Sequence, residues 1–407
     1  MQKIAKYLDY IIYYSLIILP FSVSVAPAFT STFVGFLISS FVFKKIIRRE
    51  KLFINTAINL PFMFLFLLSV ISFKNTINYS DSFRGMIRLV QNAFVFLICA
   101  EEIKDEKHIG RIFLSVISGA SLASFDAIWQ VLTGKDFIRG YAPVINLGMV
   151  RATASFKDSN VLGIYLSAVA PLLFGPALYH CKKKKKIAMF LASLIALAGI
   201  LLTYSRPTLL AIYMALFFLS LVRQDKKLIA FLVILVLIAP FILPRAVKDW
   251  AREVEYNPLR FMCNDDRIAV YRNSLNMIKD HPFIGLGVNT YMKNYKKYKE
   301  PVEYRNVVTK DYMYAHNNFI HMAAETGLIG FGFFLWLLYK LFTECKNIYR
   351  KLNDDYMKIA SLSLSACLIA FLVNGLTESS LYYSRVAIIF WYITGFALSL
   401  KKFAHAD

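Results

Sequence analysis

The chain has 407 residues, of which 57% are hydrophobic and only 18% are charged, and its mean hydropathy is +0.51. Soluble domains are about 45–50% apolar and about 25% charged, so the composition argues against a soluble enzyme, a disordered chain or a secreted disulfide scaffold. The formal net charge of +21 does not by itself indicate a nucleic-acid partner, because membrane proteins gather lysine and arginine on their cytoplasmic side.

Apolar segments recur along the chain at about the length that a helix needs to cross a bilayer core. We therefore predict an all-α, polytopic integral membrane protein with twelve spans. The spans are predicted at residues 10–27, 28–43, 58–73, 82–100, 112–131, 161–179, 187–204, 207–222, 228–243, 318–342, 357–376 and 386–400. The resulting domains are residues 1–243 with the first nine spans, a large and partly helical loop at 244–317, and residues 318–407 with the last three spans.

Clusters of lysine and arginine follow the even-numbered spans and fix the predicted orientation. They lie on the same side as Lys3 and Lys6, so both termini are expected in the cytoplasm and the large loop in the periplasm. The first span ends at Ala26-Pro27-Ala28, and its removal as a signal peptide is also compatible with this topology, although Pro27 suits a cleavage site poorly. The clusters are at 44–51, 104–111, 182–186, 223–227, 346–358 and 401–402.

A minority of the 47 lysines and arginines falls on the side where the orientation rule predicts few. Each of these side chains either extends to lipid phosphate or faces a polar cavity or partner. Because the forked guanidinium group matches phosphate oxygens, the set favours a site for a lipid-linked phosphate or diphosphate. Outside the large loop the set comprises Lys74, Arg84, Arg88, Lys135, Arg139, Arg151, Lys157, Arg206 and Arg385.

Short motifs follow one another in a fixed order around the large loop. Together they resemble the O-antigen ligase superfamily, which includes lipopolysaccharide O-antigen ligases and related surface-glycan polymerases. The motifs are Ser205-Arg206 at the end of the seventh span, an arginine-bearing helix start at 264–272, P-x-x-G-x-G at 282–287, His316-Asn317, and E-x-G-x-x-G at 325–330. Residues 151–160 before the sixth span extend the resemblance.

The resemblance implies a metal-independent, inverting glycosyltransferase of the GT-C type in the bacterial inner membrane, with its active site facing the periplasm. The donor would be a glycan linked to undecaprenyl diphosphate, without a cofactor and without nucleic acid as a partner. A ligase transfers this glycan to a sugar hydroxyl of lipid A–core, whereas a polymerase transfers it to another glycan chain. The family histidine falls on His316 and the diphosphate-binding arginines on Arg206 and Arg267, while Arg151 and Arg272 match by region.

Other interpretations of these residues remain open at this point. His316 is either the catalytic base, as imidazole suits proton transfer near neutral pH, or a loop residue that only forms hydrogen bonds. Glu325 and Glu378 either orient this histidine, pair with an arginine, or belong to a network at helix ends. A transporter or flippase of lipid-linked sugar would use the same arginines without chemistry, with Asp126 as its intramembrane acid.

Overall fold

The computed structural model describes residues 2–146, 148–180, 183–242, 245–257, 260 and 262–404. Residues 181 and 182, where the lysine cluster 182–186 begins, lie outside the described residues. So do residues 243 and 244, which hold the boundary between the first two predicted domains.

Each predicted span coincides with a helix, although residues 161–179 form two helices that meet at Ala170-Pro171. Before the large loop the apolar helices are α1 (Gln2–Val25), α2 (Pro27–Arg48), α3 (Asn59–Ile71), α4 (Tyr79–Glu102), α5 (Glu106–Thr133), α6 (Ser159–Val169), α7 (Pro171–Tyr179), α8 (Lys183–Leu202), α9 (Arg206–Val222) and α10 (Lys226–Ile242). After the loop they are α15 (Asn318–Lys351), α16 (Asp355–Asn374) and α17 (Ser384–Ser399). Among the described residues, eight helices are long and apolar enough to cross a membrane. The prediction of an all-α polytopic membrane protein is confirmed at this level.

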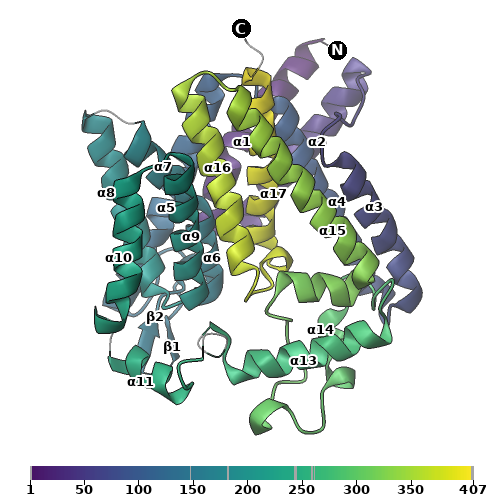
Figure 1. Cartoon of the computed structure of the whole chain (residues 1–407). Coiled ribbons are helices and arrows are strands. Elements are labelled where there is room, and N and C mark those ends of the chain that lie inside the picture. The colour runs from purple at the N-terminus through teal and green to yellow at the C-terminus, as the bar shows by residue number, and fades with distance from the viewer. Residues whose placement is uncertain are drawn as a thin grey trace.

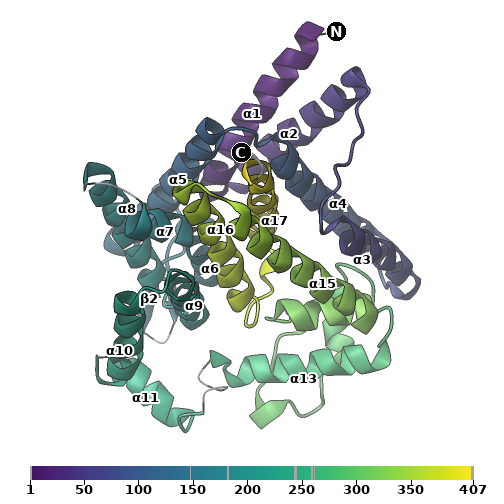
Figure 2. The same cartoon turned by 45° about the horizontal axis from the view of Figure 1, so that its top comes forward.

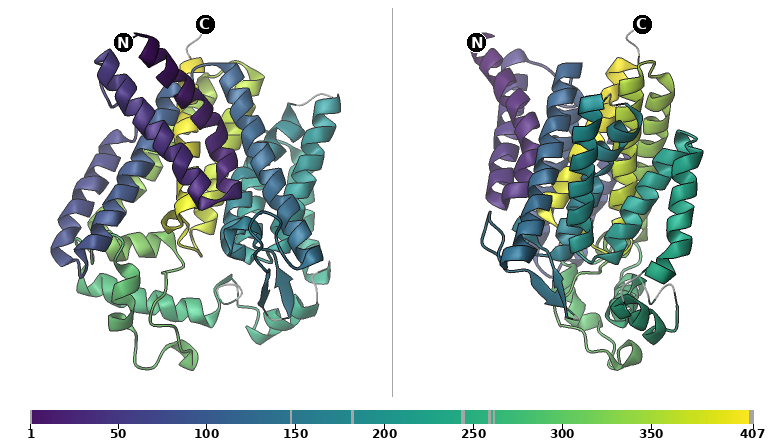
Figure 3. Two further views of the ribbon diagram at one scale, coloured as in Figure 1. Left: turned by 180° about the vertical axis from the view of Figure 1, so that it is seen from behind. Right: turned by 90° about the vertical axis from the view of Figure 1, so that its left-hand side faces the viewer.

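The helices form a bundle with the chain termini at one end and the non-membrane segments at the other (Figure 1). Near its centre, α17 packs against α4 and α16, and α16 packs against α7 and α9 (Figure 2). The large loop contains α11 (Arg245–Glu253), α13 (Asp265–Asp280) and α14 (Tyr291–Asn294). The end away from the termini also carries an antiparallel hairpin of β1 (Val144–Asn146) and β2 (Met149–Arg151) (Figure 3).

Helix α15 is broken near its start, where the sequence predicts one continuous span. Gly327 has φ 70° and ψ 179°, a conformation that is essentially confined to glycine. The P-x-x-G-x-G turn docks into this break, because Leu328 N–H donates to the Pro282 carbonyl (2.7 Å) and Gly287 N–H donates to the Glu325 carbonyl (3.0 Å). The two glycine motifs therefore form one junction that fixes the large loop onto the membrane helices.

We expect Gly327→Ala to destabilise this junction. A Cβ at position 327 would lie 2.2 Å from the Phe283 carbonyl oxygen, and the backbone conformation alone costs a non-glycine residue about 1–3 kcal/mol. Gly332→Ala in the same helix is the matched control, because its Cβ would meet no atom within 4 Å. Thermal unfolding of the purified protein in detergent should show a lower midpoint for Gly327→Ala and an unchanged or higher midpoint for Gly332→Ala. Equal midpoints for the two variants would contradict the role of the junction.

Candidate active site

Arg206 is the first residue of α9 and follows a tight turn. Tyr204 adopts a left-handed conformation (φ 48°), and Ser205 turns the chain into the helix. Pro207 suits the first turn of a helix, where its missing N–H would have no helical partner. The turn places the Arg206 guanidinium at the end of the bundle that carries the large loop.

His316 lies directly before α15, in a backbone conformation that is unusual for its residue type. Its φ is 48°, and such conformations in residues other than glycine concentrate at functional sites. Asn317 caps α15 by accepting hydrogen bonds from Phe319 N–H and Ile320 N–H (2.8 and 3.0 Å). The Tyr271 hydroxyl donates to the His316 carbonyl (3.0 Å). The main chain at His316 is thus held by the Tyr271 hydroxyl and by the helix cap that Asn317 forms.

The hydroxyl of Tyr271 stays protonated and can serve as this donor. Burial, and then the Cys263 thiol beside it, raises the pKa of the Tyr271 hydroxyl above its usual range. Tyr271 belongs to α13, which begins at an Asn264 cap, so α13 and the start of α15 are joined at the histidine.

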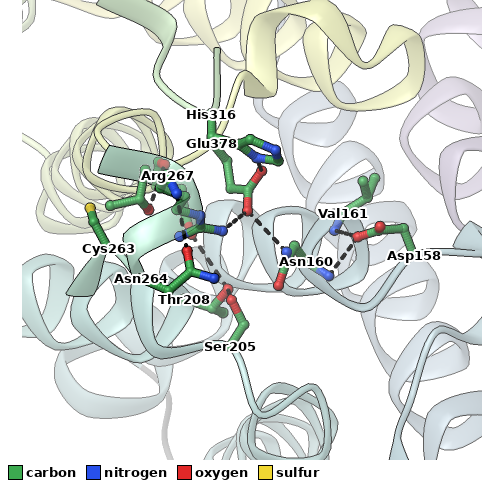
Figure 4. A network of polar contacts seen from close by, with 12 residues as sticks. Asp158, Asn160, Val161, Ser205, Thr208, Cys263, Asn264, Arg267, His316 and Glu378 are labelled. Atoms are coloured by element: carbon green, nitrogen blue, oxygen red, sulfur yellow. Dashed lines mark hydrogen bonds and ion pairs between the residues drawn. The ribbon is translucent and has the colours of Figure 1, made fainter. Parts of the chain in front are cut away.

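Glu378 is the centre of the site, although it comes from the segment between α16 and α17 (Figure 4). Its carboxylate is 1% exposed, forms an ion pair with Arg267, and lies 3.1 Å from His316 Nδ1. Burial alone would raise the pKa of the Glu378 carboxyl, but Arg267 and His316 lower it below its usual value. Glu378 is therefore ionised at neutral pH and holds the histidine and the arginine together.

Asn160 connects this carboxylate to a second arginine. Its side-chain N–H donates to Glu378 Oε1 (2.9 Å), and its carbonyl oxygen accepts from Arg151 Nη2 (2.7 Å). Arg151 also donates from Nε to the Thr203 carbonyl (2.9 Å), next to the turn that presents Arg206. The network joins β2, α6, α13 and the starts of α9 and α15.

Four of the five residues predicted from the sequence line one pocket of about 260 Å³. They are Arg151, Arg206, Arg267 and His316, and Asp266 also lines this pocket. With Glu378 shared between Arg267 and His316, the three guanidinium groups outnumber the two carboxylates around it. We call this the arginine pocket, and its charge and forked donors suit phosphate oxygens.

Arg272, the fifth predicted residue, does not line the arginine pocket. Its side chain is exposed, and its guanidinium lies 4.8 Å from the centre of the Tyr304 ring. Arg272 follows Arg267 by five residues in α13, so the two side chains leave the helix in different directions. Membership of the same short motif does not bring both arginines to the same site.

Glu378 and Asn160 are the functional residues that the sequence motifs did not assign. Glu378 follows His316 by 62 residues, and Asn160 is farther away in the chain, so no local spacing connects them. In the sequence, Glu378 is visible only as an acidic residue beside an apolar span. That position allowed a role in orienting the histidine but did not distinguish Glu378 from Glu325.

Glu378→Gln should lower kcat by roughly 100-fold, which is the cost of a misplaced catalytic group. A glutamine amide can donate to Nδ1 and thereby favour the tautomer in which Nε2 already carries a proton. Steady-state transfer assays should show the loss in kcat with little change in the KM for the donor, and Glu378→Asp should restore part of it. A purely structural role would instead lower the thermal unfolding midpoint and leave kcat per folded molecule unchanged.

The described residues contain no group of three or more His, Cys, Asp or Glu side chains that could hold a metal ion. Metal independence stays a prediction from the resemblance. The positive charge of the arginine pocket comes from the guanidinium groups of Arg151, Arg206 and Arg267.

Comparison with known proteins agrees with the resemblance noted in the sequence. No curated protein matches the chain. Residues 191–335 match the family model described as O-Antigen ligase. The matched segment contains Arg206, Arg267 and His316, whereas the pocket residues Asn146, Arg151 and Asn160 lie outside it. Over this segment, about a third of its length, the chain is therefore similar to the O-antigen ligase family.

Proposed function

We propose that the protein is an O-antigen ligase that transfers a preassembled glycan from undecaprenyl diphosphate to a sugar hydroxyl of lipid A–core. One observation carries this proposal. A histidine held through Nδ1 by a buried carboxylate shares a pocket with three guanidinium groups. This combination provides a base for a hydroxyl group and a binding site for a diphosphate.

The reaction that fits this pocket is a single inverting displacement. The acceptor oxygen attacks the anomeric carbon on the face opposite the diphosphate, its proton passes to His316 Nε2, and the bond from the anomeric carbon to the diphosphate oxygen breaks. Because Glu378 engages Nδ1, Nε2 is the nitrogen that receives the proton. The negative charge that develops on the leaving diphosphate is stabilised by Arg151, Arg206 and Arg267.

The membrane arrangement supports the same proposal. We propose that all twelve predicted spans, with α6 and α7 together forming one of them, cross the bacterial inner membrane in a GT-C-type arrangement. The arginine pocket is lined by residues of β2 and α13, and both elements lie at the end of the bundle away from the termini (Figure 1). With cytoplasmic termini, the pocket faces the periplasm, where a lipid-linked glycan is presented.

A polymerase of the same superfamily would use the same pocket and differ only in its acceptor. A transporter without chemistry is less well supported, because its candidate acid has a structural role. Asp126 accepts a hydrogen bond from the Phe137 backbone N–H (2.9 Å) and so holds the loop after α5. The pairing of His316 with Glu378 favours chemistry instead, because it engages Nδ1 and leaves Nε2 to accept a proton.

The proposal is tested by incubating the purified protein with a lipid-linked glycan, with and without lipid A–core. Product that forms only with lipid A–core supports the ligase. Longer lipid-linked chains in its absence identify a polymerase. If neither product forms while the carrier lipid still binds, the transport alternative is favoured.

A further inference from the structure

A second charged pocket is lined by residues of α4, α14 and the start of α15. Helix α14 lies at the end of the bundle away from the termini (Figure 1). The second pocket has a volume of about 220 Å³, and we call it the cationic pocket. Arg84, Arg88, Lys293 and Asp81 line it, with Tyr312 and Tyr314 on one wall. The reaction proposed above assigns no task to any of these residues.

The cations of this pocket exceed the charge that is available to pair them. Arg84 and Lys293 share the single carboxylate of Asp81, with Arg84 at 3.6 Å. Arg88 contacts the neutral amide oxygen of Asn289 (3.3 Å). The other carboxylate, Glu325, is buried beneath the pocket and accepts hydrogen bonds from its own surroundings. An anionic group in this pocket would therefore meet an excess of positive charge.

The cationic pocket continues into an apolar one between the membrane helices. Arg88, Asn289, Glu325 and Tyr382 line both pockets. The apolar pocket is formed by side chains of α3, α4, α15 and α17, which include Leu65, Leu89, Phe334, Ile388 and Trp391. Helices α3 and α4 also carry exposed apolar side chains, such as Phe64, Leu67 and Ile87. The cationic pocket fits the phosphate-bearing headgroup of a lipid, and the apolar pocket fits its hydrocarbon chain.

The second pocket contains a histidine–carboxylate pair, but this pair is not arranged as a base. His321 Nδ1 lies 3.0 Å from Ser379 Oγ and Nε2 lies 3.3 Å from Glu325 Oε1, so both ring nitrogens are engaged. The ring is also stacked on Tyr382, with centroids 3.5 Å apart. His316, by contrast, has Nε2 left for proton transfer. The second pocket therefore suits binding and not chemistry.

A single short segment of chain separates the two pockets. Met313 and His316 line the arginine pocket, whereas Tyr312 and Tyr314 line the cationic pocket. A ligand anchored in the cationic pocket would thus lie directly across this segment from the catalytic histidine. An acceptor must present its hydroxyl to His316 from such a neighbouring position while the donor occupies the arginines.

We propose that the cationic and apolar pockets together form the acceptor site, in which Arg84, Arg88 and Lys293 bind the phosphates of lipid A–core. The assignment rests on the proposed ligase function for the identity of the acceptor. Two observations support a phosphorylated lipid as the ligand: the excess of positive charge in the cationic pocket, and the apolar pocket that continues from it. A lipid-linked glycan, the acceptor of a polymerase, is the competing occupant that the experiment must distinguish.

The test uses the full chain in lipid nanodiscs and two readouts. Binding of bisphosphorylated lipid A, and of dephosphorylated lipid A, is measured directly, and transfer rates are measured at varied lipid A–core and varied donor. The variants are Arg88→Gln combined with Lys293→Gln, and Arg84→Gln alone, whose side chain is 67% exposed. Lys296→Gln is the matched control, since Lys296 lies in the same loop, pairs with Asp311 and does not line the pocket.

We expect the double variant to weaken lipid A binding and to raise the KM for lipid A–core by tenfold or more, with the KM for the donor within twofold. Arg84→Gln should show a smaller shift in the same direction, dephosphorylated lipid A should not distinguish the variants, and Lys296→Gln should match the unchanged protein. Unchanged lipid A binding in the double variant overturns the proposal. So does a rise in the KM for the donor alone, or displacement of lipid A by the lipid-linked glycan.

The two proposals fail in different ways in this experiment. If no glycan is transferred to lipid A–core but the double variant still loses lipid A binding, the site assignment holds and the ligase function fails. If transfer proceeds with an unchanged KM for lipid A–core in the double variant, the ligase function holds and the site assignment fails.

Discussion

His316→Ala should lower the rate of glycan transfer by about 100- to 10,000-fold, which is the usual contribution of a positioned acid or base. The substitution removes the group that takes the proton of the acceptor hydroxyl. It leaves Arg151, Arg206 and Arg267 in the pocket, so binding of the lipid-linked donor should change little. The measurement compares single-turnover transfer with equilibrium binding of the donor, using protein purified in the same detergent.

His281→Ala is the control for this experiment. His281 lies in the large loop, where its ring contacts Asn75 and Asp280, and it does not line the arginine pocket. Its loss should leave transfer within a few-fold of the unchanged protein. If His316→Ala retains normal transfer, the base is another group and the mechanism is wrong. If His316→Ala loses donor binding as strongly as transfer, the histidine is a binding residue and not a base.

The apolar segments of the sequence predicted an all-α polytopic membrane protein, because bilayer thickness acts on local sequence. The sequence could not divide into groups the cations that the orientation rule left unexplained. Arg151 and Arg206 enter the arginine pocket, whereas Arg84 and Arg88 enter the cationic pocket. Arg385 is buried and donates to the backbone carbonyl oxygens of Val23 and Ser155.

The buried carboxylate shows why the candidate site was only partly predictable. From the sequence, Glu325 and Glu378 were equivalent candidates for orienting the histidine. In the structure each one pairs with a different histidine, Glu378 with His316 and Glu325 with His321. The pairing depends on how the segment after α16 folds back over the start of α15. That long-range packing leaves no local pattern in the sequence.

The order of the glycine motifs supported the resemblance, but their geometric role could not be predicted from the sequence. Contact between the P-x-x-G-x-G turn and the break at Gly327 depends on tertiary hydrogen bonds. The break also divides α15 where hydropathy alone predicts a continuous span, because hydropathy does not report the φ angle of a glycine.

Substitution of the arginines in the arginine pocket should also lower the rate of glycan transfer strongly, because these residues stabilise the leaving diphosphate. Arg206→Gln should lower kcat by about 100- to 1,000-fold, the range seen when one donor to a developing negative charge is removed. It should also weaken binding of the carrier lipid, because the diphosphate is present in the ground state as well. Arg206→Lys should restore part of the binding but less of the rate, since lysine keeps the charge but lacks the planar fork.

Arg267→Gln should produce a similar loss of rate together with a change at the histidine. Arg267 is the ion-pair partner of Glu378, so its removal leaves a buried carboxylate with one fewer counter-charge. Arg272→Gln is the comparison in the same helix, because Arg272 is exposed and its guanidinium lies over the Tyr304 ring outside the pocket. Carrier-lipid binding and single-turnover transfer should both separate Arg206→Gln and Arg267→Gln from Arg272→Gln. Equal losses for Arg272→Gln would mean that the large loop moves Arg272 into the site during the reaction. Unchanged carrier-lipid binding in both Arg206→Gln and Arg267→Gln would show that the diphosphate does not bind in this pocket.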